Sequence, residues 1–369
     1  MEYYNSLKSK LFSPINQIPE SLCSSYYPSI DGLRGVAIIS VILCHLATHK
    51  EFNITVDGSI GVQIFFILSG FLITTLLLKE WVKFGTVSFK KFYIRRSLRI
   101  LPVAYLYIFT LIILNLIFHF GLSFENTITT IFYLKNFPLA NTAQTGHFWT
   151  LSVEEQFYLI VPIILISNVN RYIKIIFSLI IIVPIIDYVA FNNVGIFYTN
   201  EIVHKATYVL VSLLDEGSMY IFAGSIFSIL IFKGVLVVEK FKNYYFLSTV
   251  LFLVAVAIHS TLRLSIYVAN FAVVSIFTVL MGFIIAINLN ENNLLTKILS
   301  NRILVKIGIL SYSLYIWQEI FTLKQPWAGM FNYADNLFLN TVLLFIVAYC
   351  SYEFYEVRFL NLKKKFKTT

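Results

Sequence analysis

Apolar runs follow one another along most of this 369-residue sequence, each about as long as a helix that crosses the roughly 30 Å hydrocarbon core of a bilayer. Charged residues make up 13% of the sequence, against about 25% in a typical soluble domain, so lipid must face much of the apolar surface. Ten runs are expected to form membrane spans, at about 33–49, 59–78, 100–120, 148–167, 172–191, 216–232, 244–260, 265–287, 306–323 and 337–355. The predicted fold is an all-α, polytopic membrane bundle of about ten transmembrane helices.

The sequence before the first run is polar. It contains Pro14, Pro19 and Pro28, which interrupt any helix, and it lacks the apolar run of a signal peptide. We expect an N-terminal segment at 1–28, one membrane domain at 29–360 and a basic tail at 361–369.

The distribution of positive charge orients the predicted bundle. With ten spans, both termini lie on one side, and 22 of the 28 Lys and Arg residues fall on that side while five fall on the other; the remaining one is Arg34, in the first span. Because cytoplasmic loops are enriched in Lys and Arg, both termini are predicted to be cytoplasmic. This enrichment explains the net charge of +9 without a nucleic-acid partner.

The cysteines give no sign of a metal site or a disulfide framework. Cys23, Cys44 and Cys350 lie far apart, without Cys-x-x-Cys or Cys/His ligand spacing. We expect no bound metal.

Ionisable residues inside spans are costly and are therefore functional candidates. His45 lies eleven residues beyond Arg34, which places it about 16 Å further along the first span. Glu154 is expected about 10 Å inside the outer end of the fourth span, and Gln318 and Glu319 at a similar height in the ninth. The sequence thus predicts that these side chains converge in the outer half of the membrane.

Simpler interpretations compete with this one. His45 could be an interfacial residue, and for His147 and His259, near predicted outer ends, the interfacial interpretation is favoured. Glu154 and Glu155 point about 100° apart on a helix, so at most one is expected to face the same cavity as His45.

A cluster of positive charge precedes the third predicted span, in the stretch KKFYIRRSLRILP. It could anchor the chain to anionic lipid. It could also bind phosphates, because Arg95 and Arg99 are four residues apart on one helix face, Arg96 lies beside them, and guanidinium groups bind phosphates through two hydrogen bonds. A donor with a pyrophosphate and a long arm, such as coenzyme A, could be held there and still reach His45.

Several motifs together resemble the acyltransferase 3 family, integral-membrane enzymes that modify cell-surface glycans. They are SIDGLRGVAIISVILCH, GVQIFFILSGFLITTLL, FYIRRSLRILPVAYLY, HFWTLSVEEQFYL and SYSLYIWQ, with a looser match at YEFYEVRF. They occur in family order from about residue 29 to 359. All of them in order are highly specific for the family.

The resemblance implies site residues. Arg34 and His45 match the family's essential Arg–His pair, Glu154 its functional carboxylate, and Arg95, Arg96 and Arg99 its binding motif for acyl-coenzyme A. Ser69 lies in the family's Phe-Phe-x-x-Ser-Gly turn, where close helix packing with Gly70 is slightly favoured over a chemical role. The residues expected to contact substrate or line its path are Asp31, Ser69, Trp149, Tyr315 and Gln318.

The sequence departs from the family pattern in two places. Gln318 occupies a position where the family often has His, and Arg358 one where relatives commonly have Pro. Many members also carry an appended SGNH-hydrolase-type domain that completes transfer to the sugar, and these 369 residues contain none. We therefore expect either that the bundle transfers to the acceptor itself or that a separate partner does so.

The predicted function is transfer of an acyl group from cytoplasmic acyl-coenzyme A to a hydroxyl of a lipid-linked or surface polysaccharide. Acetyl is the favoured acyl group, and the polysaccharide could be O-antigen, capsule or exopolysaccharide. The predicted location is the bacterial inner membrane. His45 would act as general base or be transiently acylated, and Glu154 would orient the His45 imidazole. Arg34 would interact with the donor or stabilise the negative charge that develops during transfer. The rival interpretations are a transporter of lipid-linked sugar with a His45–Glu154 proton relay, and a structural subunit of a glycan-assembly complex. The sequence shows no internal inverted repeat typical of many transporters.

Overall fold

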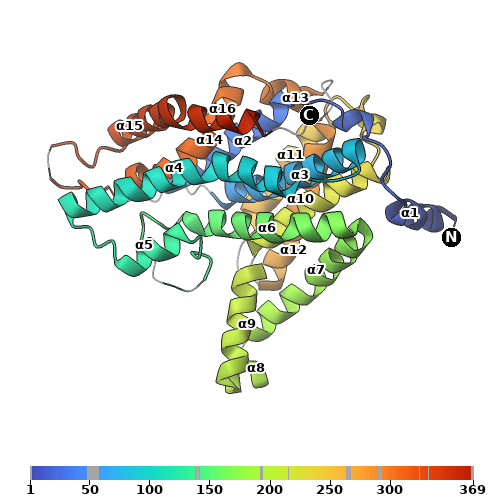
Figure 1. Cartoon of the computed structure of the whole chain (residues 1–369), viewed down its shortest axis with the longest axis horizontal. Coiled ribbons are helices and arrows are strands. Elements are labelled where there is room, and N and C mark those ends of the chain that lie inside the picture. The colour runs from blue at the N-terminus through green and yellow to red at the C-terminus, as the bar shows by residue number, and fades with distance from the viewer. Residues whose placement is uncertain are drawn as a thin grey trace.

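The computed structural model describes residues 2–47, 58–137, 139, 142–191, 194–214, 216–262, 267–289, 293–323, 325–330 and 332–366. Within these ranges the chain forms helices, turns and loops and no strand, which confirms the predicted all-α class (Figure 1). The α-helices are α1 (Glu2–Phe12), α2 (Pro28–Ala47), α3 (Ser59–Phe84), α4 (Phe89–Phe118), α5 (Phe124–Ile131), α6 (Phe148–Ser167), α7 (Val169–Phe191), α8 (Ile196–Thr199), α9 (Glu201–Leu214), α10 (Glu216–Phe232), α11 (Leu247–Leu262), α12 (Tyr267–Ile287), α13 (Leu294–Leu299), α14 (Arg302–Thr322), α15 (Leu337–Cys350) and α16 (Val357–Lys364).

Every predicted span overlaps one of these helices. In the described ranges, seven helical segments are long and apolar enough to cross a membrane, namely α2, α3, α4, α6, most of α7, α14 and the continuous segment Leu337–Lys364 that contains α15 and α16. The pair α9 and α10, bent by 44° at their junction, makes an eighth if it acts as one broken span, and the apolar parts of α11 and α12 are shorter. The protein is a polytopic helical membrane protein, and the number of crossings and the side of the termini stay predictions.

Helix α9 is the main element that the hydropathy analysis does not predict. Its first residues, Glu201 to Lys205, include three polar or charged side chains, so the apolar run falls below the length of a span. In the structure α7, α8 and α9 project together from one side of the bundle (Figure 1).

Two helix pairs form the centre of the bundle, α2 with α14 and α3 with α10, and both are in backbone contact. A Cβ atom on Gly308 of α14 would lie 1.7 Å from the carbonyl oxygen of Asp31 in α2, and one on Gly70 of α3 would lie 1.8 Å from that of Ile221 in α10. The expected packing role of Gly70 is therefore confirmed.

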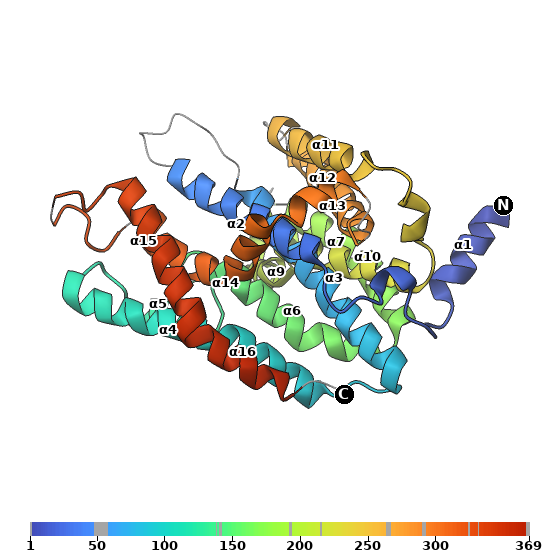
Figure 2. The same ribbon diagram turned by 90° about the horizontal axis from the view of Figure 1, so that it is seen from above.

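The C-terminal helix α16 lies along α4, as the view from above shows (Figure 2), whereas α15 packs against α14. A π-helical turn, Ser351–Glu356, joins α15 to α16. The predicted boundary at residue 360 falls inside α16, and the end of that helix is attached to α4 because the Arg95 guanidinium donates a hydrogen bond to the carbonyl oxygen of Phe366, at 2.9 Å.

Candidate functional site

A cavity of about 340 Å³ lies between α2, α3, α4, α6, α14 and α16. Along α3 its lining extends from Val62 to Lys79, seventeen residues and so about 25 Å of helix, close to the thickness of the hydrocarbon core. We refer to its Lys79 side as the basic end and to its Val62 side as the histidine end.

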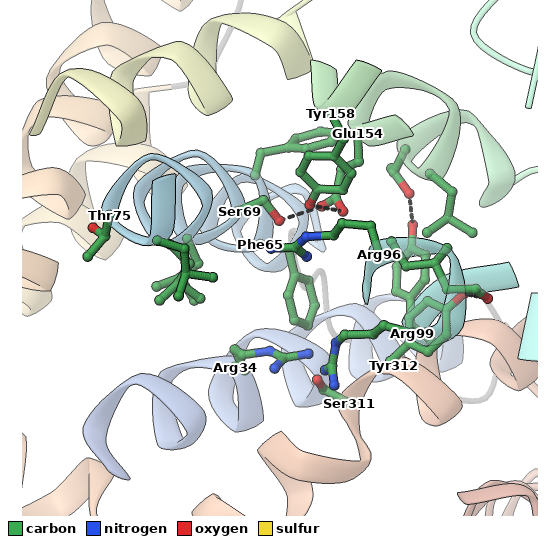
Figure 3. Close-up of a pocket in the computed structure, with 18 of the residues that line it drawn as sticks. Arg34, Phe65, Ser69, Thr75, Arg96, Arg99, Glu154, Tyr158, Ser311 and Tyr312 are labelled. Atoms are coloured by element: carbon green, nitrogen blue, oxygen red, sulfur yellow. Dashed lines mark hydrogen bonds between the residues drawn. The ribbon is translucent and has the colours of Figure 1, made fainter. Parts of the chain in front are cut away.

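Positive charge dominates the lining. Among the residues that the structure describes, five cationic side chains from four helices and one carboxylate, Glu154, line the cavity; the cations are Arg34, Lys79, Arg96, Arg99 and Lys363. Figure 3 shows the three guanidinium groups pointing toward the same space from α2 and α4. Because like charges repel at short range in a low-dielectric site, this arrangement favours an anionic ligand.

Glu154 lies at the side of this arginine group. Its carboxylate accepts hydrogen bonds from the Ser69 hydroxyl and the Tyr158 phenol, both at 2.9 Å, and the guanidinium of Arg96 stacks 4.8 Å from the Tyr158 ring centre (Figure 3). Ser69 thus has a polar role as well as a place in the packed turn.

Three residues with hydroxyl groups contribute to the lining of the cavity near the basic end. Ser24, Ser25 and Tyr27, just before α2, contribute to its lining, and Lys79 donates a hydrogen bond to the Ser24 carbonyl oxygen at 2.9 Å. Burial raises the pKa of Tyr27 to about 12, so its phenol stays protonated and donates to the Ser21 carbonyl oxygen.

The three arginines of the predicted binding motif do not share one environment in the structure. Arg96 and Arg99 line the cavity, whereas Arg95 does not; its guanidinium forms an ion pair with the buried Glu80 at 3.1 Å. Asp31 likewise lies outside the lining and pairs with Arg34 at 3.7 Å. Trp149 is also outside it and packs against Phe66.

The histidine end contains two adjacent contacts between α14 and its neighbours. The imidazole Nδ1 of His45 lies 2.8 Å from Oε1 of Gln318, which is fully buried. Because an amide oxygen only accepts hydrogen bonds, Nδ1 is the donor in this contact, and in the neutral imidazole the proton on Nδ1 leaves Nε2 as the acceptor. The predicted convergence of His45 with Gln318 is therefore confirmed.

The second contact joins His147 to Glu319. Nδ1 of His147 lies 2.7 Å from one carboxylate oxygen of Glu319, and the His147 backbone N–H donates to the other at 2.9 Å. His147 is 3% exposed and His259 is fully buried, so both side chains are surrounded by protein, and their depth in the membrane stays a prediction. Both lie inside the helical bundle.

Tyr315 lies between the cavity and the two contacts at the histidine end. It lines the cavity, its phenol lies 2.7 Å from the Thr150 hydroxyl, and it also donates to the His147 carbonyl oxygen at 3.3 Å. Gln318 follows Tyr315 by three residues, hence on the same side of α14 and about 4.5 Å further along. The cavity therefore ends about one helical turn from the His45–Gln318 contact.

The predicted partnership between Glu154 and His45 is not found. Among the described residues, the hydrogen bonds of Glu154 go to Ser69 and Tyr158, and no ion pair joins it to His45. The reason is that α6 begins inside the bundle: His147, immediately before it, is already level with Glu319, so Glu154 lies about 10 Å closer to the arginines.

Sequence reasoning missed Lys363, Tyr158 and the His147–Glu319 pair as members of the site. Tyr158 follows Glu154 by one helical turn, a spacing that a search for partners of Glu154 would have found. Lys363 lies in a basic run typical of any cytoplasmic end, and the sequence gives no signal for its position. Among the described residues, no three His, Cys, Asp or Glu side chains form a group that could hold a metal ion.

Comparison with known proteins agrees with the motif analysis. The family described as "Acyltransferase domain" matches residues 27–352. A protein of Staphylococcus aureus strain COL, provisionally named an O-acetyltransferase, is 29% identical over 365 residues, which is 90% of this chain and 57% of that protein. No solved structure matches significantly.

Two relatives carry names that state a substrate. The peptidoglycan O-acetyltransferase OatA of Listeria monocytogenes is 40% identical over 155 residues, and YrhL of Bacillus subtilis, provisionally named a peptidoglycan O-acetyltransferase, is 37% identical over 155 residues. Each match covers 38% of this chain and 24% of the relative, so the chain spans only part of the length of the relatives it matches. None of these matches supports a transporter, and together with the family match they show that the chain belongs to the acyltransferase 3 family.

Proposed function

We propose that this protein transfers an acetyl group from acetyl-coenzyme A to a hydroxyl of a cell-envelope glycan. The observation that carries the proposal is the cavity itself, with a group of cations at one end and the His45–Gln318 contact one helical turn beyond the other. Such a cavity suits a donor whose phosphates are distant from its reactive thioester.

The phosphates of the donor would be bound at the basic end. Arg34, Arg96 and Arg99 offer guanidinium groups, which bind phosphate oxygens in pairs. The pantetheine arm would lie along the apolar lining of α3, which includes Phe65, Leu68 and Leu72, and its thioester would approach Tyr315.

The chemistry at the histidine end would be general-base catalysis. Nε2 of His45 would take the proton of the sugar hydroxyl as its oxygen attacks the thioester carbonyl carbon. The new C–O bond forms as the C–S bond breaks, and the departing coenzyme A thiolate receives the proton from the imidazolium. The charge of Glu319, adjacent to Gln318, would stabilise the imidazolium.

The acceptor is proposed from the relatives. Two of them are named for peptidoglycan, so peptidoglycan is the first acceptor to test, and capsule, O-antigen and exopolysaccharide are the others. A separate partner could complete delivery of the acetyl group to the glycan. The proposed location is the bacterial inner membrane, with the basic end facing the cytoplasm.

The test is transfer of radiolabelled acetyl from acetyl-coenzyme A to these glycans by purified protein in liposomes. We expect label in one glycan, and a loss of roughly 10²- to 10⁴-fold in kcat for His45→Ala. His204→Ala is the matched control, because His204 lies in α9 and bonds to the Phe197 carbonyl oxygen outside the cavity. A parent protein that binds acetyl-coenzyme A and transfers its acetyl group to no acceptor, alone or with cell lysate, would contradict the proposal.

A further inference from the structure

The cavity has a cation that the sequence motifs do not explain. Lys363 lies near the end of α16, within a run of three lysines, Lys363 to Lys365. Only Lys363 of the three lines the cavity, while Lys364 and Lys365 are exposed.

The fold holds Lys363 beside the arginines. Helix α16 packs along α4, and the hydrogen bond from Arg95 to the Phe366 carbonyl oxygen attaches its end. Before it, the side chain of Glu356 is buried and accepts a hydrogen bond from Ser313 at 2.6 Å, which attaches the π-helical turn to α14. A π turn contains one residue more than an α turn, so it determines which lysine of the run faces α4.

The electrostatics of this position are unfavourable without a ligand. Lys363 shares the cavity with Arg34, Arg96 and Arg99. In the described part of the chain Glu154 is the one carboxylate of the lining, and it already accepts two hydrogen bonds. An ammonium group held in such surroundings gains most from an anion between it and the guanidinium groups.

We propose that Lys363 is a ligand of a donor phosphate, so that the C-terminal helix α16 forms one wall of the donor site together with α4 and α2. The inference rests on the proposed function, since it takes coenzyme A as the phosphate carrier. It assigns a binding role to the segment that composition alone describes as a basic tail.

The experiment measures the dissociation constants of acetyl-coenzyme A and of S-acetylpantetheine, which has the same arm and thioester without the nucleotide phosphates. Protein in phosphatidylcholine nanodiscs is compared with its Lys363→Ala and Lys364→Ala variants. Lys364 is the matched control, because it carries the same charge on the same helix and bonds to Asn361 rather than facing the cavity. We expect Lys363→Ala to weaken acetyl-coenzyme A binding roughly 10- to 100-fold and S-acetylpantetheine binding less than about twofold. Lys364→Ala should leave both within about twofold.

Each other outcome has a distinct meaning. Equal weakening of both ligands by Lys363→Ala, or equal effects of the two lysine variants, would overturn the role of Lys363 and leave the donor proposal intact. A parent protein that binds no acetyl-coenzyme A would overturn the donor proposal and this one with it. Anionic lipid offers the same phosphate chemistry, so an effect of Lys363→Ala that requires phosphatidylglycerol in the nanodisc would assign Lys363 to a headgroup and contradict our inference.

Discussion

Arg95 and Arg96 are neighbours in the sequence with different surroundings, and their substitution separates a binding role from a structural one. Arg96 lines the cavity, so Arg96→Ala should raise the KM for acetyl-coenzyme A roughly 10- to 100-fold. Arg95 pairs with the buried Glu80 and holds the end of α16, so Arg95→Ala should lower the Tm and change the KM less. Steady-state kinetics and thermal melts in one detergent check both. A larger KM effect for Arg95→Ala than for Arg96→Ala would contradict the assignment.

Glu319 is expected to affect turnover rather than donor binding. Glu319→Gln keeps the shape of the side chain and removes the charge beside His147 and His45, so kcat should fall at least about tenfold with the KM for acetyl-coenzyme A unchanged. Glu319→Asp, which retains the charge, should recover part of the loss. If Glu319→Gln raised the KM instead and left kcat unchanged, the carboxylate would not support catalysis at His45.

Positions along a single helix were predicted correctly, whereas several that depend on how helices meet were not. Steps along one straight helix place His45 correctly relative to Arg34, and a charge cluster correctly predicts Arg96 and Arg99 as a group. The error over Glu154 came from an assumed helix entrance, because hydropathy does not show that α6 begins inside the bundle. The His147–Glu319 pair depends on contact between distant helices, which no local pattern contains.

At the scale of helices, close packing between α2 and α14 supports the site. Gly308 of α14 contacts the backbone of Asp31, which pairs with Arg34 in the same turn of α2. Gly308→Ala should cost about 3 kcal/mol or more in the free energy of unfolding, because backbone rather than a movable side chain opposes the added methyl group.

Gly85→Ala is the control for this prediction. Gly85 has a φ of 68° and no atom within 4 Å of an added Cβ, so only the left-handed backbone penalty of about 1 kcal/mol applies. Thermal or denaturant unfolding of both variants in the same detergent measures the difference. Equal losses in the free energy of unfolding for the two variants would contradict the close backbone contact between α2 and α14.

At the scale of the whole molecule, hydropathy predicted the helical class correctly, and each predicted span overlaps a helix of the structure. It did not predict α9, because Glu201, His204 and Lys205 at the start of this helix leave its apolar run shorter than a span. It also could not show that α16 packs beside α4, since a basic amphipathic end is equally compatible with a solvated tail.

The charge distribution makes a prediction about topology. Reporter fusions after residues 200 and 330 should behave as external, and one after residue 240 as cytoplasmic, because Lys and Arg concentrate on the side of the termini. Alkaline phosphatase and fluorescent-protein fusions measure this in cells. Reversed signals would place the cationic end of the cavity outside the cell, away from cytoplasmic acetyl-coenzyme A.

The central claim is that one donor molecule occupies the whole length of the cavity, with its phosphates among the arginines and its acyl group near His45. Two photoreactive coenzyme A analogues test it in one measurement, one with a diazirine in the acyl group and one with an azide on the adenine, each followed by mass spectrometry of the labelled peptides. The account predicts that the acyl-group probe labels peptides containing His45, Thr150 or Tyr315, and that the adenine probe labels those containing Ser24 or Lys363. Labelling by the acyl-group probe at the basic end alone, with none at the histidine end, would contradict it.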